Sequence, residues 1–420
     1  MPTTLHDEMM ALGDRAVAAA RQLATVDTAQ KNAALQAMAK ALGTRAAAIL
    51  AANRQDLEAA RSAGVSPALL DRLALDERRL DAMARGLEAV AALPDPVGQT
   101  MAAWRRPNGL EIRKVRVPIG VIAIIYEARP NVTADAAALC VKSSNAVLLR
   151  GGREAAASNR AIAEALREGL RAAALPEDSI LFVDTPDREA VREIVQMVGR
   201  VDLVIPRGGE GLIRAVTEMA RVPVIKHYKG VCHVYVDAAA DLEMALAIAE
   251  NAKCQRPGVC NAMECLIVHR AVAPHFLPRL AGRLTARGCR LKGDAEARAI
   301  VPSMEAATEE DWFTEYLDLV LNVRVVGSVE EAIAHIERYG SHHSDAIVTR
   351  DERAAEQFVR GVDSAAVYVN ASTRFTDGGE FGLGAEMGIS TDKIHARGPM
   401  GLEELTSYKY IVWGTGQIRT

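Results

Sequence analysis

The chain has 420 residues, of which half are hydrophobic and a quarter are charged, and its formal net charge at pH 7 is -4. This balance is ordinary for a globular protein and gives no reason to expect a nucleic acid or a membrane surface as partner. A single hydrophobic core stops growing below this length, so two domains with smaller additions are expected. The chain shows neither a secretory leader nor an apolar run long enough to cross a bilayer, so we expect a cytoplasmic protein whose six cysteines are reduced thiols.

The first part of the chain is predicted to be helical. Residues 1–92 are rich in Ala, Leu and Arg at helical spacing, with glycines and a proline between the runs. Residues 111–117 then alternate charged and apolar side chains, which favours a strand with one face solvated or covered by a partner. The run 408–413 near the end of the chain is also strand-like.

Between residues 119 and 226, apolar runs of strand length alternate with helical stretches. The predicted strands are 120–125, 146–149, 180–183, 203–205 and 222–225. This alternation is typical of βαβ units in an open parallel sheet, where ligands bind outside the carboxyl ends of the strands. We therefore predict a nucleotide-binding domain in this region.

A second α/β region follows. It begins with a predicted helix at 241–253, after which a loop containing Gly and Pro leads to Cys260. The predicted strands beyond this loop are 265–268, 323–326, 346–348 and 366–369. The same alternation predicts a second α/β domain.

Two glycine turns are candidates for binding an anion. Their residues are Arg150, Gly151, Gly152 and Arg153 after the strand 146–149, and Gly208 and Gly209 after the strand 203–205. Glycine lets backbone approach another group closely, and the start of a helix offers free N–H groups. For either turn alone, a tight βα connection without a ligand is an equally good interpretation. Two such turns on neighbouring strands favour a ligand.

Cys260 differs from the other cysteines in its surroundings. It lies in a loop between a predicted helix and a predicted strand, whereas Cys254 ends that helix and Cys265 begins that strand. By spacing alone, a free cysteine is more often a small buried side chain than a nucleophile. The loop position favours the nucleophile.

No metal site is predicted. The cysteines at 254, 260 and 265 lack the paired spacing of a zinc site, and no suitable histidines lie near them in sequence. We interpret His342 and His343 as a solvated or hydrogen-bonded pair.

Three long blocks of sequence, at 117–133, 253–264 and 378–390, make the chain resemble the aldehyde dehydrogenase superfamily over essentially its full length. The resemblance implies an α/β protein with two Rossmann-like open-sheet domains and a small β module that joins subunits into a homodimer or homotetramer. The implied division is 1–105 for the N-terminal helices of the cofactor domain, 106–117 for an oligomerisation strand, 118–240 for the NADP-binding domain, 241–385 for the catalytic domain with the nucleophilic cysteine, 386–404 for a return to the cofactor domain, and 405–420 for a C-terminal oligomerisation strand.

Within the superfamily, the blocks are most similar to members that reduce an activated glutamyl group. This implies NADPH-dependent reduction of L-glutamyl 5-phosphate to L-glutamate 5-semialdehyde and phosphate, the second step of proline biosynthesis from glutamate, through a thioester on Cys260. A separate glutamate 5-kinase would supply the acyl phosphate, because the chain is too short to contain one. The alternatives are a coenzyme A-acylating aldehyde dehydrogenase and a non-catalytic oligomeric scaffold of the same fold.

The resemblance also implies roles for the glycine turns. Arg150 falls where the superfamily usually has a lysine that touches the adenosine ribose, and Arg153 falls where many NAD-using members have a glutamate. An arginine there can pair with a 2′-phosphate, which favours NADPH over NADH. Gly151 and Gly152 complete this turn. Gly208 and Gly209 match a glycine-serine pair that meets the pyrophosphate.

The remaining site residues belong to the catalytic half. Glu315 matches the glutamate that holds the nicotinamide ribose, and Arg256 is the candidate for binding the glutamyl carboxylate. The usual oxyanion-hole asparagine is replaced by Ala128, so Asn131 at a helix start is the candidate donor, together with the backbone N–H of Cys260. The stretch 226–231 lacks the glutamate that activates water in aldehyde-oxidising members. The missing carboxylate suits an enzyme that reduces its thioester.

Overall fold

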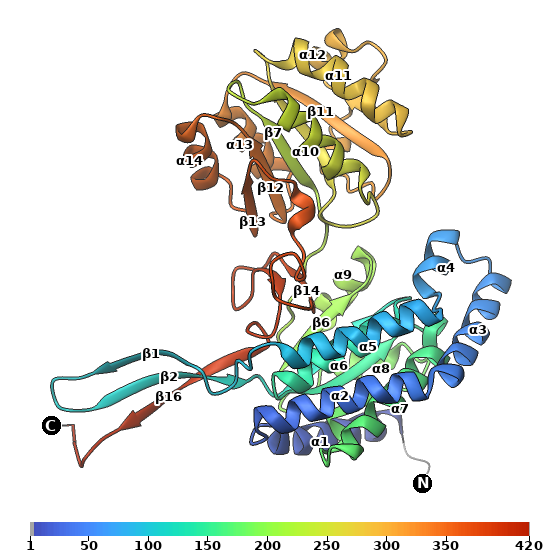
Figure 1. The fold of residues 1–420 in the computed structure, drawn as a ribbon, viewed down its shortest axis with the longest axis vertical. Coiled ribbons are helices and arrows are strands. Elements are labelled where there is room, and N and C mark those ends of the chain that lie inside the picture. The colour runs from blue at the N-terminus through green and yellow to red at the C-terminus, as the bar shows by residue number, and fades with distance from the viewer. Residues whose placement is uncertain (1–3, 420) are drawn as a thin grey trace. The chain divides into compact units, whose positions relative to one another are not determined.

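The computed structural model describes residues 4–419, apart from the side chains of residues 67 and 68. The chain forms two compact units (Figure 1). The first contains Met1–Lys226, Gly382–Gly388 and Met400–Thr420, and the second contains His227–Phe381 and Ile389–Pro399. The division therefore falls before β7 (Cys232–Val236), whereas the predicted cofactor domain extended to residue 240. The reason is that β7 pairs with strands of the second sheet. The segment 386–404 was predicted to return to the cofactor domain, but residues 389–399 within it belong to the second unit.

The predicted helices over residues 1–92 are confirmed. They are α1 (Leu5–Leu23), α2 (Thr28–Thr44), α3 (Ala46–Ser62), α4 (Pro67–Leu73) and α5 (Glu77–Ala92). Side-chain oxygens of Thr4, Asp27 and Asp76 accept backbone N–H groups at the starts of α1, α2 and α5, which fixes where these helices begin. None of the helices in the described part of the chain combines the length and apolar character needed to cross a membrane.

A four-stranded parallel sheet forms the centre of the first unit. Its strands, in spatial order, are β5 (Ile180–Phe182), β4 (Ala146–Gly151), β3 (Val121–Tyr126) and β6 (Leu203–Arg207). The helices that alternate with these strands along the chain are α6 (Pro130–Lys142), α7 (Ala156–Ala172), α8 (Glu189–Val195) and α9 (Glu210–Met219), with short 3₁₀ turns at Arg153–Ala155 and Glu177–Ser179. Alternate residues of β3 pack with α1 and α8 in one apolar cluster. The predicted open parallel sheet is confirmed.

Two details of that prediction are wrong. Residues 222–225 do not form a strand, since Val224 makes only an isolated bridge to Val204. Pro223 lies in this segment, and a proline has no N–H to donate to a sheet. In addition, β4 and β6 are not neighbours, because β3 lies between them. The two glycine turns therefore flank the turn after β3.

The second unit is built on a seven-stranded parallel sheet. Its strands, in spatial order, are β10 (Glu305–Ala306), β9 (Arg290–Gly293), β11 (Val320–Val326), β8 (Met263–His269), β7, β12 (Ser344–Val348) and β13 (Ala366–Val369). The helices are α10 (Leu242–Cys254), α11 (Ala273–Ala286), α12 (Ala295–Ile300), α13 (Val329–Tyr339) and α14 (Glu352–Gly361), with 3₁₀ turns at Asp311–Phe313 and Thr373–Phe375. Val234 and Val236 of β7 pack with α10 to α12, and Tyr235 packs with α13 and α14. Helices therefore cover both faces of this sheet.

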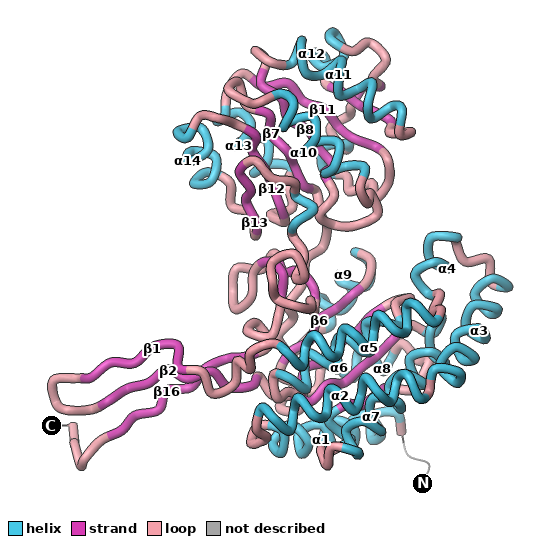
Figure 2. The backbone as a smooth tube through the Cα atoms, in the orientation of Figure 1, coloured by secondary structure: helices cyan, strands magenta, loops and turns pink. Residues whose placement is uncertain are grey.

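Two smaller sheets complete the fold. Strands β14 (Gly388–Ser390) and β15 (Gly398–Met400) pair with each other, and β1 (Thr100–Arg105), β2 (Glu111–Pro118) and β16 (Thr406–Trp413) form an antiparallel ribbon. The predicted strands 111–117 and 408–413 are thus confirmed and pair with one another, while β1 was not predicted. The ribbon projects from the helices of the first unit (Figure 2).

Candidate active site

The candidate site of the second unit lies at the amino ends of four neighbouring strands. In the order β11, β8, β7 and β12, the segments that precede these strands carry Glu315, Cys260, His227 and His343. Because the strands are parallel, their amino ends meet at one edge of the sheet. Residues far apart in sequence are gathered there. This edge is opposite to the carboxyl edge at which open α/β sheets usually bind ligands.

Cys260 lies in the loop between α10 and β8, as predicted, and is half-buried. Its backbone oxygen accepts a hydrogen bond from Cys232 Sγ at 3.2 Å. A Cβ atom on Gly230 would lie only 1.8 Å from that same oxygen. Only glycine can therefore hold the loop before β7 against the Cys260 backbone.

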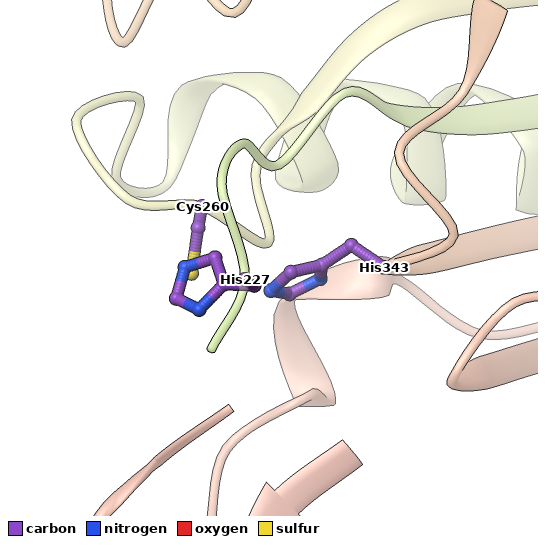
Figure 3. Close-up of side chains that lie close together, drawn as sticks. All are labelled: His227, Cys260 and His343. Atoms are coloured by element: carbon purple, nitrogen blue, oxygen red, sulfur yellow. The ribbon is translucent and has the colours of Figure 1, made fainter. Parts of the chain in front are cut away.

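Two histidines face the sulfur of Cys260. Ligand atoms of His227, Cys260 and His343 all lie within 4.8 Å of one another, and Figure 3 shows the three side chains converging. His227 Nδ1 lies 2.8 Å from the Ile389 carbonyl oxygen. Because a carbonyl oxygen only accepts hydrogen bonds, we assign the proton of the neutral ring to Nδ1, which leaves Nε2 as the basic nitrogen.

The interpretation of His342 and His343 as solvated or hydrogen-bonded is confirmed in its second form: His342 is hydrogen-bonded to the Asp363 carbonyl, and His343, which is fully buried, is hydrogen-bonded to Ser344. Burial and the nearby His227 hold the pKa of His343 well below its usual range, so its imidazole is neutral. His343 Nδ1 lies 2.8 Å from Ser344 Oγ, which lies 2.6 Å from Thr376 Oγ1. Its Nε2 has no hydrogen-bond partner within residues 4–419.

Glu315 holds the loop that lies against Cys260. Its Oε1 accepts the Gly230 N–H at 2.9 Å. The segment that carries Glu315 is fixed in turn, because the Leu317 N–H donates to Glu264. Glu264 forms a fully buried ion pair with Lys253 at 2.7 Å, and burial raises the pKa of Glu264 to about 7. A structural role for Glu315 is visible, and its contact with a nicotinamide ribose stays a prediction.

Arg256 is exposed near a second arginine that was not predicted. Burial, and next the charge of Arg256, lower the pKa of Arg374. The Arg374 guanidinium donates to Gln255 Oε1 at 2.8 Å and to the Asn261 side chain. Two guanidinium groups thus flank the Cys260 loop, and guanidinium is well suited to bind a carboxylate. Arg374 is more than a hundred positions from Cys260, so no spacing rule could have found it.

His227 and His343 were also missed as site residues. The stretch 226–231 lacks a carboxylate but contains His227. A base is therefore present beside Cys260 even though the glutamate is absent. For His343 the only signal was its position directly before a buried strand, and the neighbours of that strand are not evident from the sequence.

In the first unit, the turn after β4 is held by hydrogen bonds and packing contacts with neighbouring residues. Arg150 is buried, and its guanidinium donates to the carbonyl oxygens of Gly151 at 2.6 Å and Asp187 at 3.3 Å. Arg153 is exposed. Cβ atoms on Gly151 and Gly152 would each lie 2.1 Å from a neighbouring side chain, namely Asn159 and Glu154. Packing within the chain accounts for both glycines, and their role toward a ligand stays a prediction.

The turn after β6 already holds an anionic group. Gly209 is the N-cap of α9, and its N–H donates to Glu127 Oε2 at 2.9 Å. A Cβ atom on Gly208 would lie 2.4 Å from the same oxygen. A carboxylate at this helix start occupies the kind of position that a phosphate prefers. An incoming pyrophosphate would have to displace Glu127.

Asn131 belongs to the first unit and lies in the first turn of α6, as predicted. It is exposed, and its Nδ2 donates to Asp135 Oδ2 at 3.0 Å. Burial raises the pKa of Asp135 to about 6. The oxyanion role of Asn131 stays a prediction.

Comparison with known proteins identifies close relatives of the chain. Residues 3–318 match the model of the aldehyde dehydrogenase family. The gamma-glutamyl phosphate reductase of Moorella thermoacetica is 58% identical over 98% of this chain and 99% of its own length, and that of Geobacter metallireducens is 54% identical over 99% and 100%. The crystal structure of the Thermotoga maritima gamma-glutamyl phosphate reductase is similar with a TM-score of 0.97 at 48% identity, covering 99% of this chain and 100% of that one.

Proposed function

Because this chain belongs to the aldehyde dehydrogenase family and, within it, to the gamma-glutamyl phosphate reductases, we propose that it reduces L-glutamyl 5-phosphate through a thioester on Cys260. The products are L-glutamate 5-semialdehyde and phosphate, and the reaction is a step of proline biosynthesis. The observation that carries the role of Cys260 is its half-buried sulfur in a loop that two histidines face.

The first half of the reaction needs a thiolate. In our proposal His227 Nε2 takes the proton of the Cys260 thiol, and the sulfur attacks the acyl carbon of the substrate. The bond between that carbon and the phosphate oxygen breaks, and the proton on His227 passes to the departing phosphate. Atoms and charge balance, because one thiol and one acyl phosphate become one thioester and one phosphate. Arg256 and Arg374 are the candidates for orienting the glutamyl carboxylate.

The second half needs a reductant. Enzymes of the aldehyde dehydrogenase family use a nicotinamide dinucleotide, and we propose NADPH here; when bound, it supplies the hydride that converts the thioester to the aldehyde. The Cys260 thiolate is then released and takes up a proton. The absence of a carboxylate at 226–231 does not remove every base from the site, since His227 is present. Reduction in place of hydrolysis must therefore depend on how water is kept from the thioester.

The first unit carries the residues proposed to hold NADPH. Gly208 and Gly209 at the start of α9 already accommodate the Glu127 carboxylate, which supports an anion at that position. Arg153 is exposed and is the residue proposed to pair with the 2′-phosphate, while Arg150 is turned toward backbone oxygens. Arg153→Glu should weaken NADPH by about 10- to 100-fold while sparing NADH, as expected for loss of a charged hydrogen bond. An unchanged preference in steady-state kinetics with both dinucleotides would contradict this role.

A homodimer or homotetramer is proposed from the antiparallel ribbon. Trp104, Tyr408, Tyr410 and Trp413 are between 40% and 62% exposed on it, and large aromatic side chains are typical of interfaces. The cytoplasmic location and the coupling to a separate glutamate 5-kinase stay predictions.

The role of Cys260 is tested by comparing Cys260→Ala with Cys254→Ala in the reverse assay, which contains glutamate semialdehyde, phosphate and NADP+. Loss of the nucleophile should lower turnover by at least about three orders of magnitude, whereas Cys254, at the end of α10, should be dispensable. Replacing phosphate by coenzyme A distinguishes the coenzyme A-acylating alternative. Retained turnover in Cys260→Ala would exclude the proposed thioester.

A further inference from the structure

The cluster of Cys260, His227 and His343 has the composition of a metal site. Their ligand atoms lie at most 4.8 Å apart, and the three residues come from segments that precede β8, β7 and β12. In a tetrahedral zinc site, ligand atoms lie about 3.3–3.8 Å apart, since Zn–N and Zn–S bonds are about 2.0–2.3 Å. Side-chain rotations that bring the three atoms closer by roughly 1 Å would therefore suffice.

A second observation points to a ligand at this place. His343 is fully buried, yet its Nε2 has no hydrogen-bond partner in the part of the chain that the structure describes. A buried nitrogen without a partner is costly, and this one, unlike the similarly unpartnered His233 Nε2 and His335 Nδ1, belongs to a group with a half-buried thiol. Figure 3 shows the His343 ring directed toward His227 and Cys260. Ser344 Oγ lies 2.8 Å from Nδ1 and can accept the Nδ1 proton. This hydrogen bond orients the ring and leaves the lone pair of Nε2 for a metal.

The site is also partly accessible to solvent, and the His227 ring is held in place by a hydrogen bond. Cys260 and His227 are only half-buried. The Ile389 carbonyl accepts from His227 Nδ1, the arrangement by which metal-binding histidines are commonly oriented through their second nitrogen. One thiolate and two imidazoles suit a borderline-soft ion such as Zn²⁺, and not the hard ion Mg²⁺.

We propose that Cys260, His227 and His343 bind one Zn²⁺ ion reversibly, with a fourth position left to water, and that the bound ion blocks the reaction. Binding forms Zn–S and Zn–N bonds and releases the thiol proton to solvent. The sulfur is then held by the metal and cannot attack an acyl carbon. Zinc binding does not depend on the proposed role of Cys260, but inhibition by zinc does.

The test titrates the full-length protein with Zn²⁺ in competition with a coloured chelator, without substrate. The variants are His227→Asn and His343→Asn, because an asparagine amide can replace the Nδ1 contacts with Ile389 and Ser344 while it removes Nε2. Cys260→Ala removes the sulfur. Cys265→Ala is the matched control, since Cys265 belongs to the buried group of Cys265, His233 and His335 in the same unit. Co²⁺ serves as a second probe, because a cobalt–thiolate bond absorbs light.

The wild-type protein and Cys265→Ala should bind one Zn²⁺ per chain with equal affinity, and each of the other three variants should bind at least about tenfold more weakly. The thiolate band of Co²⁺ should be absent in Cys260→Ala alone. Wild-type affinity in both histidine variants, or loss of binding in Cys265→Ala, would overturn the site. Tight binding at the site without inhibition of turnover would leave the metal site standing and exclude the role of Cys260 as nucleophile.

Discussion

The second unit contains two groups of one cysteine and two histidines, and they differ mainly in exposure. Cys260, His227 and His343 lie at the amino edge of the sheet, where two of the three are half-buried. Cys265 lies on β8, His233 lies on β7 and His335 lies on α13, and none of the three is more than 4% exposed. His233 and Cys265 are direct partners in the pairing of β7 with β8. The same residue types thus occur in a partly accessible group at the amino ends of the strands and in a group enclosed in the core.

The buried group is organised for packing. His233 Nδ1 lies 2.8 Å from Asp345 Oδ1, and Cys265 Sγ lies 3.5 Å from His335 Nε2. His335 also packs edge-on against Trp312. Burial raises the pKa of the Cys265 thiol and lowers the pKa of His335 to about 2, so both are neutral. Residue type alone therefore does not define an active site. A reactive cysteine must also be accessible, and it is the loop position of Cys260 that makes its sulfur accessible.

Thiol reactivity should separate the two groups most strongly. Iodoacetamide should alkylate Cys260 in the folded protein about 10⁴-fold faster than Cys265, because Cys265 becomes accessible only when the fold opens and its thiol is hard to ionise. Peptide mass spectrometry over a time course measures both rates, with urea-unfolded protein as the control. Similar rates in the folded protein would remove the distinction.

His227→Asn should lower turnover by about 10²- to 10⁴-fold, the usual contribution of a general base. The variant keeps an amide that can donate to Ile389 and leaves the first unit unchanged, so the dissociation constant of NADP+ should not change. His335→Gln in the buried group is the matched control and should retain turnover. The base assignment fails if His227→Asn shows the turnover and pH–rate profile of the wild-type protein.

The smallest expected effect concerns stability at acid pH. The pKa of His335 is about 2 in the folded chain and about 6.5 in an unfolded one, so protons bind the unfolded chain first as the pH falls below 6.5. Stability is thus full above pH 6.5 and decreases on acidification, by about 1.4 kcal/mol at pH 5.5 from this residue.

Urea unfolding at pH 7.5 and 5.5 tests this effect. His335→Gln does not titrate and should lose about 1.4 kcal/mol less than the wild-type protein between the two pH values. His275→Gln on the exposed surface of α11 is the control and should follow the wild type. Equal losses in His335→Gln and wild type would show that His335 does not resist protonation.

The sequence predicted the elements that follow from local periodicity, and it failed where partners distant in the chain decide the outcome. The strand from Ala146 and the helix that ends at Cys254 were predicted because their apolar residues recur at the proper spacing. Strand β1 was missed because all of its residues are exposed, so it lacks an alternating pattern and depends on pairing with β2. Residues 222–225 look apolar, but Pro223 limits them to a bridge.

The same reason explains the site. Cys260 could be distinguished from the other cysteines by its position in a loop. The resemblance of the chain to the aldehyde dehydrogenase superfamily then implied that Cys260 forms a thioester. His343 and Arg374 come to the site only through the order of strands in the sheet and the turn after β13, which no local pattern reveals. Their contribution required the three-dimensional arrangement.

The thioester on Cys260 can be observed directly. Protein mixed with freshly generated L-glutamyl 5-phosphate, in the absence of any dinucleotide, should gain the mass of one glutamyl group and release one phosphate per chain. Mapping should place the added mass on Cys260 and never on Cys265, and addition of NADPH should remove it with formation of the semialdehyde. The account would be contradicted if the wild-type protein turned over substrate without ever gaining this mass. It would also be contradicted if Cys260→Ala gained the mass to the same extent as the wild-type protein.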